Sequence, residues 1–224
     1  MTPSPNPRSP ASAVYYGGRD ATQIFENAGV AVMSDSLVYK YQYTCSDVAD
    51  LVFVLDASGS IGGSNFQTLK HFVQQLVGSF NIGESNVRVG VLRFDNYASP
   101  IFYLNTYYDA DDIISAVGSI AYSGQGTAQS TMFTASRGDR TGVPNVGVVI
   151  TDGASNSPYD TANAAARARD AGITLLALGI GGGVNYGELN AIATDPDEDN
   201  VFTVSGFSSL DQIRETFQRA ICEA

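Results

Sequence analysis

The sequence predicts an α/β domain over residues 46–224, built as a doubly wound, mostly parallel sheet with helices on both faces. Two observations predict this class. Short, continuous apolar runs such as LVFVL at 51–55 are typical of strands that are buried on both faces. Segments with apolar residues at helical spacing lie between these runs, and strands that alternate with helices indicate parallel βαβ units.

Each element follows from one of these two patterns. The expected strands are 51–55, 87–94, 101–104, 146–150, 173–178 and 201–204. The expected helices are 66–80, 111–120, one that begins near residue 128, 158–171, 186–193 and 210–221. Ser157 and Pro158 form the pattern of an N-cap followed by proline at the first helical position, and Gly172 suits the C-terminal cap of the same helix.

The first 45 residues fall outside the alternating pattern. Four prolines within the first ten residues predict a disordered, proline-rich arm, which we place at residues 1–12. Residues 13–45 form an N-terminal extension to which the pattern assigns no fold, although residues 38–43 alternate enough to form a strand.

The charge balance of the chain limits its partners. Twelve basic and 23 acidic residues give a net charge of −11, so we expect no nucleic-acid binding, which needs a basic surface. No stretch reaches the roughly 18–20 apolar residues of a membrane span, so we also expect no membrane insertion.

The chain has two cysteines, and both lie near the ends of the predicted domain. Cys45 just precedes the first strand, and Cys222 is the third residue from the end. This placement favours a disulfide that joins the two ends of the domain in an oxidising, extracellular setting. Two unrelated buried thiols are the alternative, and placement alone leaves it open.

Polar side chains follow two of the buried runs, and a third polar loop lies between them in the sequence. In open α/β sheets ligands bind beyond the carboxyl ends of the strands, so these side chains can converge on one crevice. The candidates are Asp56, Ser58 and Ser60 after the first run, Thr127 in the polar loop 123–127, and Asp152 after the run 146–150. Two carboxylates and three hydroxyls are hard oxygen donors, which suit Mg²⁺, Ca²⁺ or Mn²⁺ and argue against zinc or copper.

The spacing and charge of these groups support a metal site. Asp56, Ser58 and Ser60 are two positions apart, and Gly59 lets the backbone turn tightly between them. Two carboxylates balance the charge of a divalent cation. A coordination position left open on the ion would attract an acidic group of a partner.

The sequence DASGS at 56–60 resembles the DxSxS signature of the von Willebrand factor A domain, whose metal centre is called the metal-ion-dependent adhesion site. The resemblance covers about residues 48–222 and includes GVLRF at 90–94, GT at 126–127 and VITDG at 149–153. It implies a six-stranded, mainly parallel sheet with one antiparallel edge strand, for which 101–104 is the candidate. It also implies that the metal ligands are Asp56, Ser58, Ser60, Thr127 and Asp152.

Two further points follow from the resemblance. The family's third loop usually reads Gly-Gly-Thr-x-Thr, and here Gln129 replaces the second threonine, which is not normally a ligand. A Cys45–Cys222 pairing is similar to the disulfide of extracellular members.

Other motifs in the sequence favour different functions less well. A phosphate-accepting Asp56 of the haloacid-dehalogenase kind would need a second carboxylate at position 58, which is serine, and a response regulator would need a lysine after a later strand, where neither Lys40 nor Lys70 stands. His71 lies within the first expected helix, which disfavours a Ser-His-Asp triad. The glycine run at 179–183 departs from the nucleotide-binding pattern at Val184, so we interpret it as a structural turn.

Two more motifs invite binding interpretations. The tripeptide RGD at 137–139 would be recognised by integrins if it lay at an exposed loop tip. The acidic run 195–199 lacks the glycine and the glutamate of a calcium-binding EF-hand loop, because Asn200 and Gly206 stand there, so we expect a solvated loop.

The resemblance implies a secreted, non-enzymatic adhesion module of the extracellular matrix, of the matrilin or collagen VI kind. Its Mg²⁺, with Ca²⁺ or Mn²⁺ as alternatives, would be completed by a carboxylate of collagen or another matrix protein. The alternative is a structural module that crosslinks matrix or mineralised fibres and whose metal is chiefly structural. An intracellular chaperone-like or ATPase-associated A domain is disfavoured by the two terminal cysteines.

Overall fold

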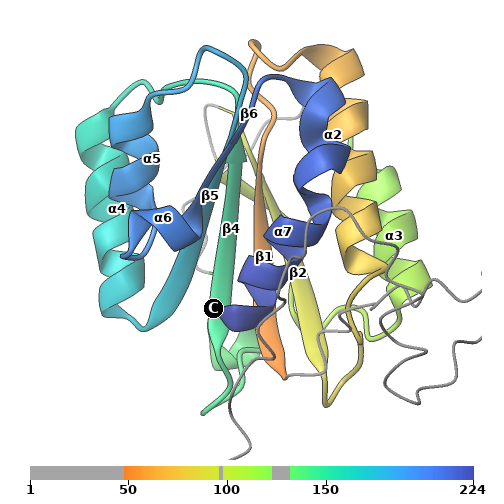
Figure 1. The fold of residues 1–224 in the computed structure, drawn as a ribbon. Helices are drawn as coiled ribbons and strands as arrows, with labels where there is room; N and C mark the ends of the chain where they lie inside the picture. The colour runs from red at the N-terminus through yellow and green to blue at the C-terminus, as the bar shows by residue number, and fades with distance from the viewer. Residues whose placement is uncertain (1–47, 96–97, 123–131) are drawn as a thin grey trace, which may run out of the picture. The chain divides into compact units, whose positions relative to one another are not determined.

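The computed structural model describes residues 48–95, 98–122 and 132–224. Its centre is a six-stranded sheet with the strand order β3-β2-β1-β4-β5-β6 (Figure 1). The strands are β1 (Ala49–Asp56), β2 (Val87–Phe94), β3 (Ala98–Phe102), β4 (Asn145–Thr151), β5 (Ile173–Ile180) and β6 (Val201–Val204). The α-helices are α2 (Gly62–Val77), α3 (Ala110–Gly118), α4 (Pro158–Asp170), α5 (Tyr186–Ile192), α6 (Asp197–Asn200) and α7 (Leu210–Glu223).

The pairing of the strands confirms the predicted sheet. β1 pairs in parallel with both β2 and β4, and the parallel ladder continues through β5 to β6. β3 pairs antiparallel with β2 and forms one edge, as expected of the strand placed at 101–104. It starts three residues earlier than expected and contains Pro100, which an edge strand tolerates because one of its sides makes no ladder hydrogen bonds.

Helices cover both faces of the sheet. Figure 1 shows α2, α3 and α7 on one side and α4 and α5 on the other. Alternate residues of β1 divide between the two faces: Phe53 packs in the larger core with α2 and α7, whereas Val52 packs with Leu104 and Met132. Both are almost fully buried, which explains the continuous apolar run of this strand.

The helix boundaries agree with the sequence in most places. Ser157 caps α4 by accepting a hydrogen bond from the backbone N–H of Asp160, Pro158 is its first residue, and Gly172 has a positive φ of 81° just after its end. The helix expected near residue 128 begins outside the described residues; from residue 132 to β4 the structure has a single short 3₁₀ turn, Ala135–Arg137.

Two expectations need correction. The acidic run was predicted as a loop, but Asp197–Asn200 forms the helical turn α6, whose first turn carries the acidic side chains that a helix N-terminus favours. The helix α2 begins at Gly62, four residues before the first apolar position of the predicted helix, and ends three residues before Phe80. Among the described residues no helix is long and apolar enough to cross a membrane.

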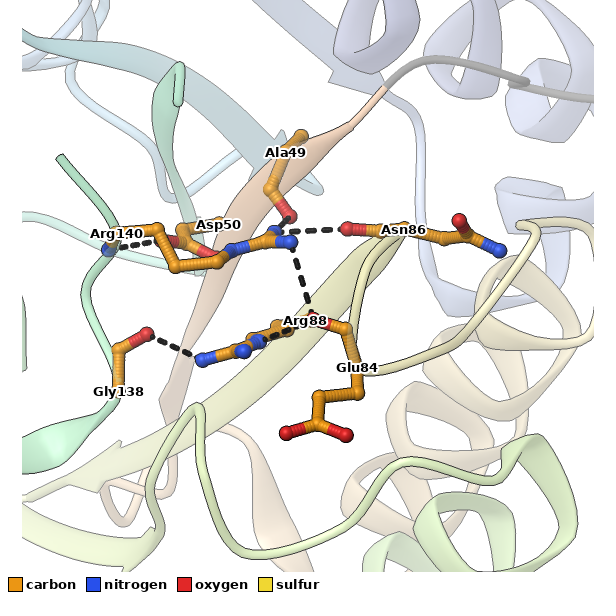
Figure 2. A network of polar contacts seen from close by, with 7 residues as sticks. All are labelled: Ala49, Asp50, Glu84, Asn86, Arg88, Gly138 and Arg140. Carbon is orange, nitrogen blue, oxygen red and sulfur yellow. Dashed lines mark hydrogen bonds and ion pairs between the residues drawn. The ribbon is translucent and has the colours of Figure 1, made fainter. Parts of the chain in front are cut away.

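A network of polar contacts closes the end of the sheet at which β1 begins (Figure 2). The guanidinium of Arg140 forms an ion pair with Asp50, with 2.7 Å between Nη2 and Oδ1, and the backbone N–H of Arg140 donates to Oδ2 at 2.7 Å. The same guanidinium donates to the carbonyl oxygens of Ala49 and Asn86. Arg140 therefore joins the start of β1 to the turn before β2. No pattern in the sequence indicates this contact.

The strand order places the candidate site. The chain leaves β1 toward β2 and β3 and then returns to β4 on the other side of β1, so the strand order reverses between β1 and β4. Leu55 lies opposite Ile150 in the ladder, so the carboxyl ends of the two strands are level. Such a reversal point is where open α/β sheets bind ligands.

Candidate metal site

Four of the five predicted metal ligands lie together at the carboxyl ends of β1 and β4. The hydroxyl oxygens of Ser58 and Ser60 are 2.9 Å apart, and the Ser60 hydroxyl donates to Oδ1 of Asp152 at 2.7 Å. Asp56 ends β1, and its Oδ1 accepts the backbone N–H of Ser58 at 2.8 Å. The first loop and the loop after β4 thus meet side chain to side chain, as the sequence predicts.

The carboxylate of Asp56 is held from two sides. Its Oδ2 accepts a hydrogen bond of 2.7 Å from the hydroxyl of Thr151, the last residue of β4. Both groups are buried, and Asp56 is only 4% exposed. A buried carboxylate with a hydrogen bond to each oxygen has a fixed orientation, so Asp56 is preorganised before any ion arrives.

The loop that carries the two serines is held by Tyr122. The Tyr122 hydroxyl donates to the backbone oxygen of Ser58 at 2.8 Å and accepts the N–H of Gly62 at 3.2 Å. Its ring packs against Phe66 of α2, with 5.6 Å between the centroids. The spacing of apolar residues gives no sign of this role, because 64 positions separate Tyr122 from Ser58.

Thr127 and Cys45 lie outside the described residues, so both remain predictions. The segment that leads toward the third loop is nevertheless fixed. Arg93 donates to the backbone oxygen of Ala121 at 2.7 Å, and buried Lys70 donates to those of Gly118 and Ile120. Burial lowers the pKa of Lys70. Together with Tyr122, which binds the serine loop, these contacts fix the described segment 118–122.

Electrostatics at the site favour a cation. Burial raises the pKa of Asp152; the hydrogen bond from Ser60 opposes this, and the negative charge of Asp56 adds to it. Two carboxylates that face the same small volume repel one another, and a divalent cation between them would neutralise that repulsion. Ser60 is exposed and Asp152 half-buried, so a ligand could reach an ion held there.

The donor set fits a hard cation. Neighbouring ligand oxygens around an octahedral Mg²⁺ lie about 2.9 Å apart, given bonds of about 2.0–2.1 Å at right angles. The hydrogen-bonded oxygens of Ser58, Ser60 and Asp152 already have this spacing, at 2.9 and 2.7 Å. Within the described ranges no three His, Cys, Asp or Glu side chains gather into a metal-binding group. The candidate site would not form such a group, because two of its four described donors are hydroxyls.

The other motifs singled out in the sequence are not binding sites of this kind. His71 is exposed on α2. The RGD tripeptide is not an exposed tip: Gly138 is buried with φ 97°, its carbonyl accepts from Arg88, and the Arg137 guanidinium lies 4.7 Å over the Tyr103 ring. The glycine run after β5 is structural, because a Cβ on Gly183 would lie 2.9 Å from the backbone oxygen of Asp152.

Two side chains that support the candidate site were not predicted from the sequence. Thr151 is adjacent to Asp152, yet nothing in the motif indicates that its hydroxyl binds Asp56. Glu188, in α5, is buried and accepts the backbone N–H of Ser155 in the loop after β4. A lone glutamate near the start of a helix carries no local sign of such a contact, because Ser155 lies 33 positions earlier.

Comparison with known proteins agrees with this geometry. A profile of the von Willebrand factor type A domain matches residues 50–216. Matrilin-2 of Mus musculus is 35% identical over 186 residues, which are 78% of this chain and 19% of that protein. The collagen alpha-6(VI) chain of Homo sapiens is 37% identical over 188 residues, 80% of this chain and 8% of the relative. The chain therefore spans a small part of each relative.

Solved structures show the same fold. One of them is proximal thread matrix protein 1 from the mussel byssus, with zinc in its metal-ion-dependent adhesion site (MIDAS) motif. It is 30% identical with a TM-score of 0.69, and the match covers 80% of this chain and 47% of that one. The manganese-loaded TRAP protein of Plasmodium vivax, at 21% identity and a TM-score of 0.59 over 77% of this chain and 74% of that one, shares the fold. The chain belongs to the von Willebrand factor type A domain family, among relatives that are secreted proteins of the extracellular matrix.

Proposed function

We propose that this chain is a non-enzymatic adhesion module that binds a protein ligand of the extracellular matrix through a divalent cation. The cation, Mg²⁺ first and Ca²⁺ or Mn²⁺ as alternatives, would be held by Asp56, Ser58, Ser60, Thr127 and Asp152. The observation that carries the proposal is the run of hydrogen-bonded oxygens from Ser58 through Ser60 to Asp152. A carboxylate of the ligand would complete the coordination from the exposed side.

Collagen is the first candidate for the ligand, since the relatives include matrilins and collagen chains. Two tyrosines offer contact area for such a ligand. Tyr159 and Tyr186 are 77% and 63% exposed in the first turns of α4 and α5. These helices follow β4 and β5, so both begin at the carboxyl edge of the sheet, the edge that carries the candidate site. Exposed tyrosines supply large contact area at low entropic cost.

Calorimetric titration of the metal-free protein tests the cation. We expect Mg²⁺ binding in the wild type and none in Asp56→Ala, because the variant loses one of two carboxylates. Asp170→Ala is the matched control, since Asp170 is an exposed carboxylate at the far end of α4. Zinc belongs in the titration because a relative holds it in its MIDAS motif. Equal Mg²⁺ affinity in wild type and Asp56→Ala would refute the proposal.

A collagen pull-down with and without EDTA tests the ligand. Binding that is lost in EDTA and in Asp56→Ala supports adhesion through the cation. Binding that survives both treatments would instead assign adhesion to a side face of the domain. Absence of binding to collagen in Mg²⁺ would direct the same assay to other matrix proteins.

A structural assembly module is the second candidate, and one comparison favours it: the thread matrix protein of the mussel byssus is among the structural relatives. In that case the metal would stiffen the domain, and the chain would associate with copies of itself. Light scattering over a range of protein concentrations should then show growing particles. A mass that stays monomeric at every concentration removes this candidate.

We also propose the Cys45–Cys222 disulfide. Cys222 lies in the last turn of α7 and packs, half-buried, against the main core. A covalent bond from this point to the residues before β1 would join the first and last elements of the domain. Peptide mapping without reduction should recover the two cysteines in one linked fragment, and two alkylated thiols in the native protein would contradict the bond.

A further inference from the structure

Glu188 is a buried carboxylate with no place in the proposed set of metal ligands. It lies in the first turn of α5 and is 7% exposed. Its two carboxylate oxygens accept the same backbone N–H, that of Ser155, at 3.2 and 3.0 Å. A buried carboxylate is costly unless it is hydrogen-bonded, so this contact is a strong constraint on the segment that contains Ser155.

That segment is the loop that presents Asp152. Ser155 follows Asp152 by three residues, and the hydroxyl of Thr151, which donates to Asp56, accepts the backbone N–H of Gly153 at 3.3 Å. On its other side the loop touches the turn after β5, where Gly183 approaches the backbone oxygen of Asp152 so closely that a Cβ would lie 2.9 Å away. The loop is therefore held between the end of β4 and the connection from β5 to α5.

The position of Asp152 depends on this hold. Its carboxylate is only half-buried, and its described side-chain hydrogen bond is the one it accepts from Ser60 at 2.7 Å. Without a fixed backbone, the two carboxylates of the site would be free to move apart. Contacts one step behind the metal ligands commonly set affinity in this way.

We propose that Glu188 is a positioning residue of the metal site: by binding the Ser155 N–H it fixes the loop after β4 and keeps Asp152 within reach of Ser60. This inference rests on the proposed function. It differs from a merely structural role of Glu188 in α5, which would change the stability of the domain and leave its metal affinity unchanged while it is folded.

Two variants and two measurements test the inference. Glu188→Leu removes both acceptors, and Glu188→Gln keeps one acceptor in the same shape. Mg²⁺ titration at a temperature where all the proteins are folded should give a dissociation constant about 10–100-fold higher in Glu188→Leu than in wild type. Glu188→Gln should give an intermediate value. Hydrogen exchange of the metal-free proteins should show the Ser155 amide exchanging faster in Glu188→Leu than in wild type.

Ile192→Val is the matched control, because Ile192 is a buried residue of the same helix and packs in the apolar cluster that contains Ala165 and Leu175. It should lower stability and leave both the Mg²⁺ affinity and the Ser155 exchange rate unchanged. If Glu188→Leu does not fold, faster Ser155 exchange in Glu188→Gln supports the proposal and wild-type exchange overturns it.

The outcomes separate this inference from the proposed function. Normal Mg²⁺ binding in the wild type together with unchanged affinity in Glu188→Leu would overturn the inference alone. A wild-type protein that binds no divalent cation would overturn the proposed function, and the positioning role would fall with it.

Discussion

Replacing Arg140 with methionine should destabilise the domain strongly without affecting its metal site. Asp50, the ion-pair partner of Arg140, is fully buried, whereas the Arg140 side chain is 16% exposed. Methionine keeps much of the length of the side chain but removes the charge. Breaking a buried pair from one side typically costs about 3–5 kcal/mol, because the remaining charge stays buried without its partner.

Two contributions in the structure act on this loss in opposite directions and leave it within that range. The backbone N–H of Arg140 still donates to Asp50 in the variant, so the carboxylate keeps one hydrogen bond. Against this, the carbonyl oxygens of Ala49 and Asn86 each lose a donor, at about 0.5–1.5 kcal/mol apiece. We therefore expect about 3–5 kcal/mol, a large share of the roughly 5–15 kcal/mol that stabilises a typical domain.

Urea denaturation measures this loss, with Arg167→Met as the matched control because Arg167 is an exposed arginine of α4. The control should stay within about 0.5 kcal/mol of wild type. Asp50→Asn alone and combined with Arg140→Met completes a double-mutant cycle. If the unpaired charge causes the loss, the double variant should be more stable than the sum of the single losses predicts.

The metal affinity of Arg140→Met should equal that of wild type. Asp56 lies six positions after Asp50 along β1, which is about 20 Å at roughly 3.3 Å per residue. Two results would refute the reasoning: a free energy of unfolding within about 0.5 kcal/mol of wild type, or losses in the cycle that are simply additive.

Four other predictions follow from the site. Thr151→Val removes the hydroxyl that binds Asp56 and should weaken Mg²⁺ binding in calorimetry by about 10–100-fold; an unchanged affinity would show that Asp56 needs no such support. Gly183→Ala places a Cβ 2.9 Å from the backbone oxygen of Asp152 and should lower the Mg²⁺ affinity and the melting temperature. Gly182→Ala is its control, because a Cβ at that position meets no atom within 4 Å. Mg²⁺ at about 100 times its dissociation constant should raise the free energy of unfolding by about 2.7 kcal/mol over that in EDTA, and equal melting in the two conditions would contradict a site specific to the folded state. Tyr159→Ser combined with Tyr186→Ser should reduce collagen retention in the pull-down while Mg²⁺ binding stays normal, and full retention would place the ligand elsewhere.

The fold could be predicted almost completely because its signals are local. The apolar run of β1 and the spacing in α2 reflect burial that each segment undergoes by itself. The errors are of the same local kind. The helical turn α6 was missed because four residues carry too little periodicity. The edge strand was predicted to begin at residue 101 because Pro100 was assigned to a turn, whereas β3 begins at Ala98.

The residues of the candidate metal site could be singled out in part because the topology of parallel sheets gathers the residues that follow each strand. Asp56 and Asp152 are each found within one residue of a strand end, and the rule for ligand sites in such sheets then brings them together. The groups that hold these ligands could not be predicted. Tyr122 and Glu188 act on segments 64 and 33 positions away, and their residue types are common in any helix or loop.

A sequence motif indicates the metal ligands of such a site but not the side chains that hold them in place. A motif such as DASGS reports which donors are present, but affinity depends on whether the donors from two loops stay within about 3 Å of one another. In this chain we expect that distance to be maintained by Thr151, which joins the end of β4 to Asp56 at the end of β1, and by Glu188, which holds the loop after β4 from α5. Two chains with the same five donors can therefore differ widely in metal affinity when these supporting side chains differ. Exchanging the supports while keeping the donors separates the two contributions.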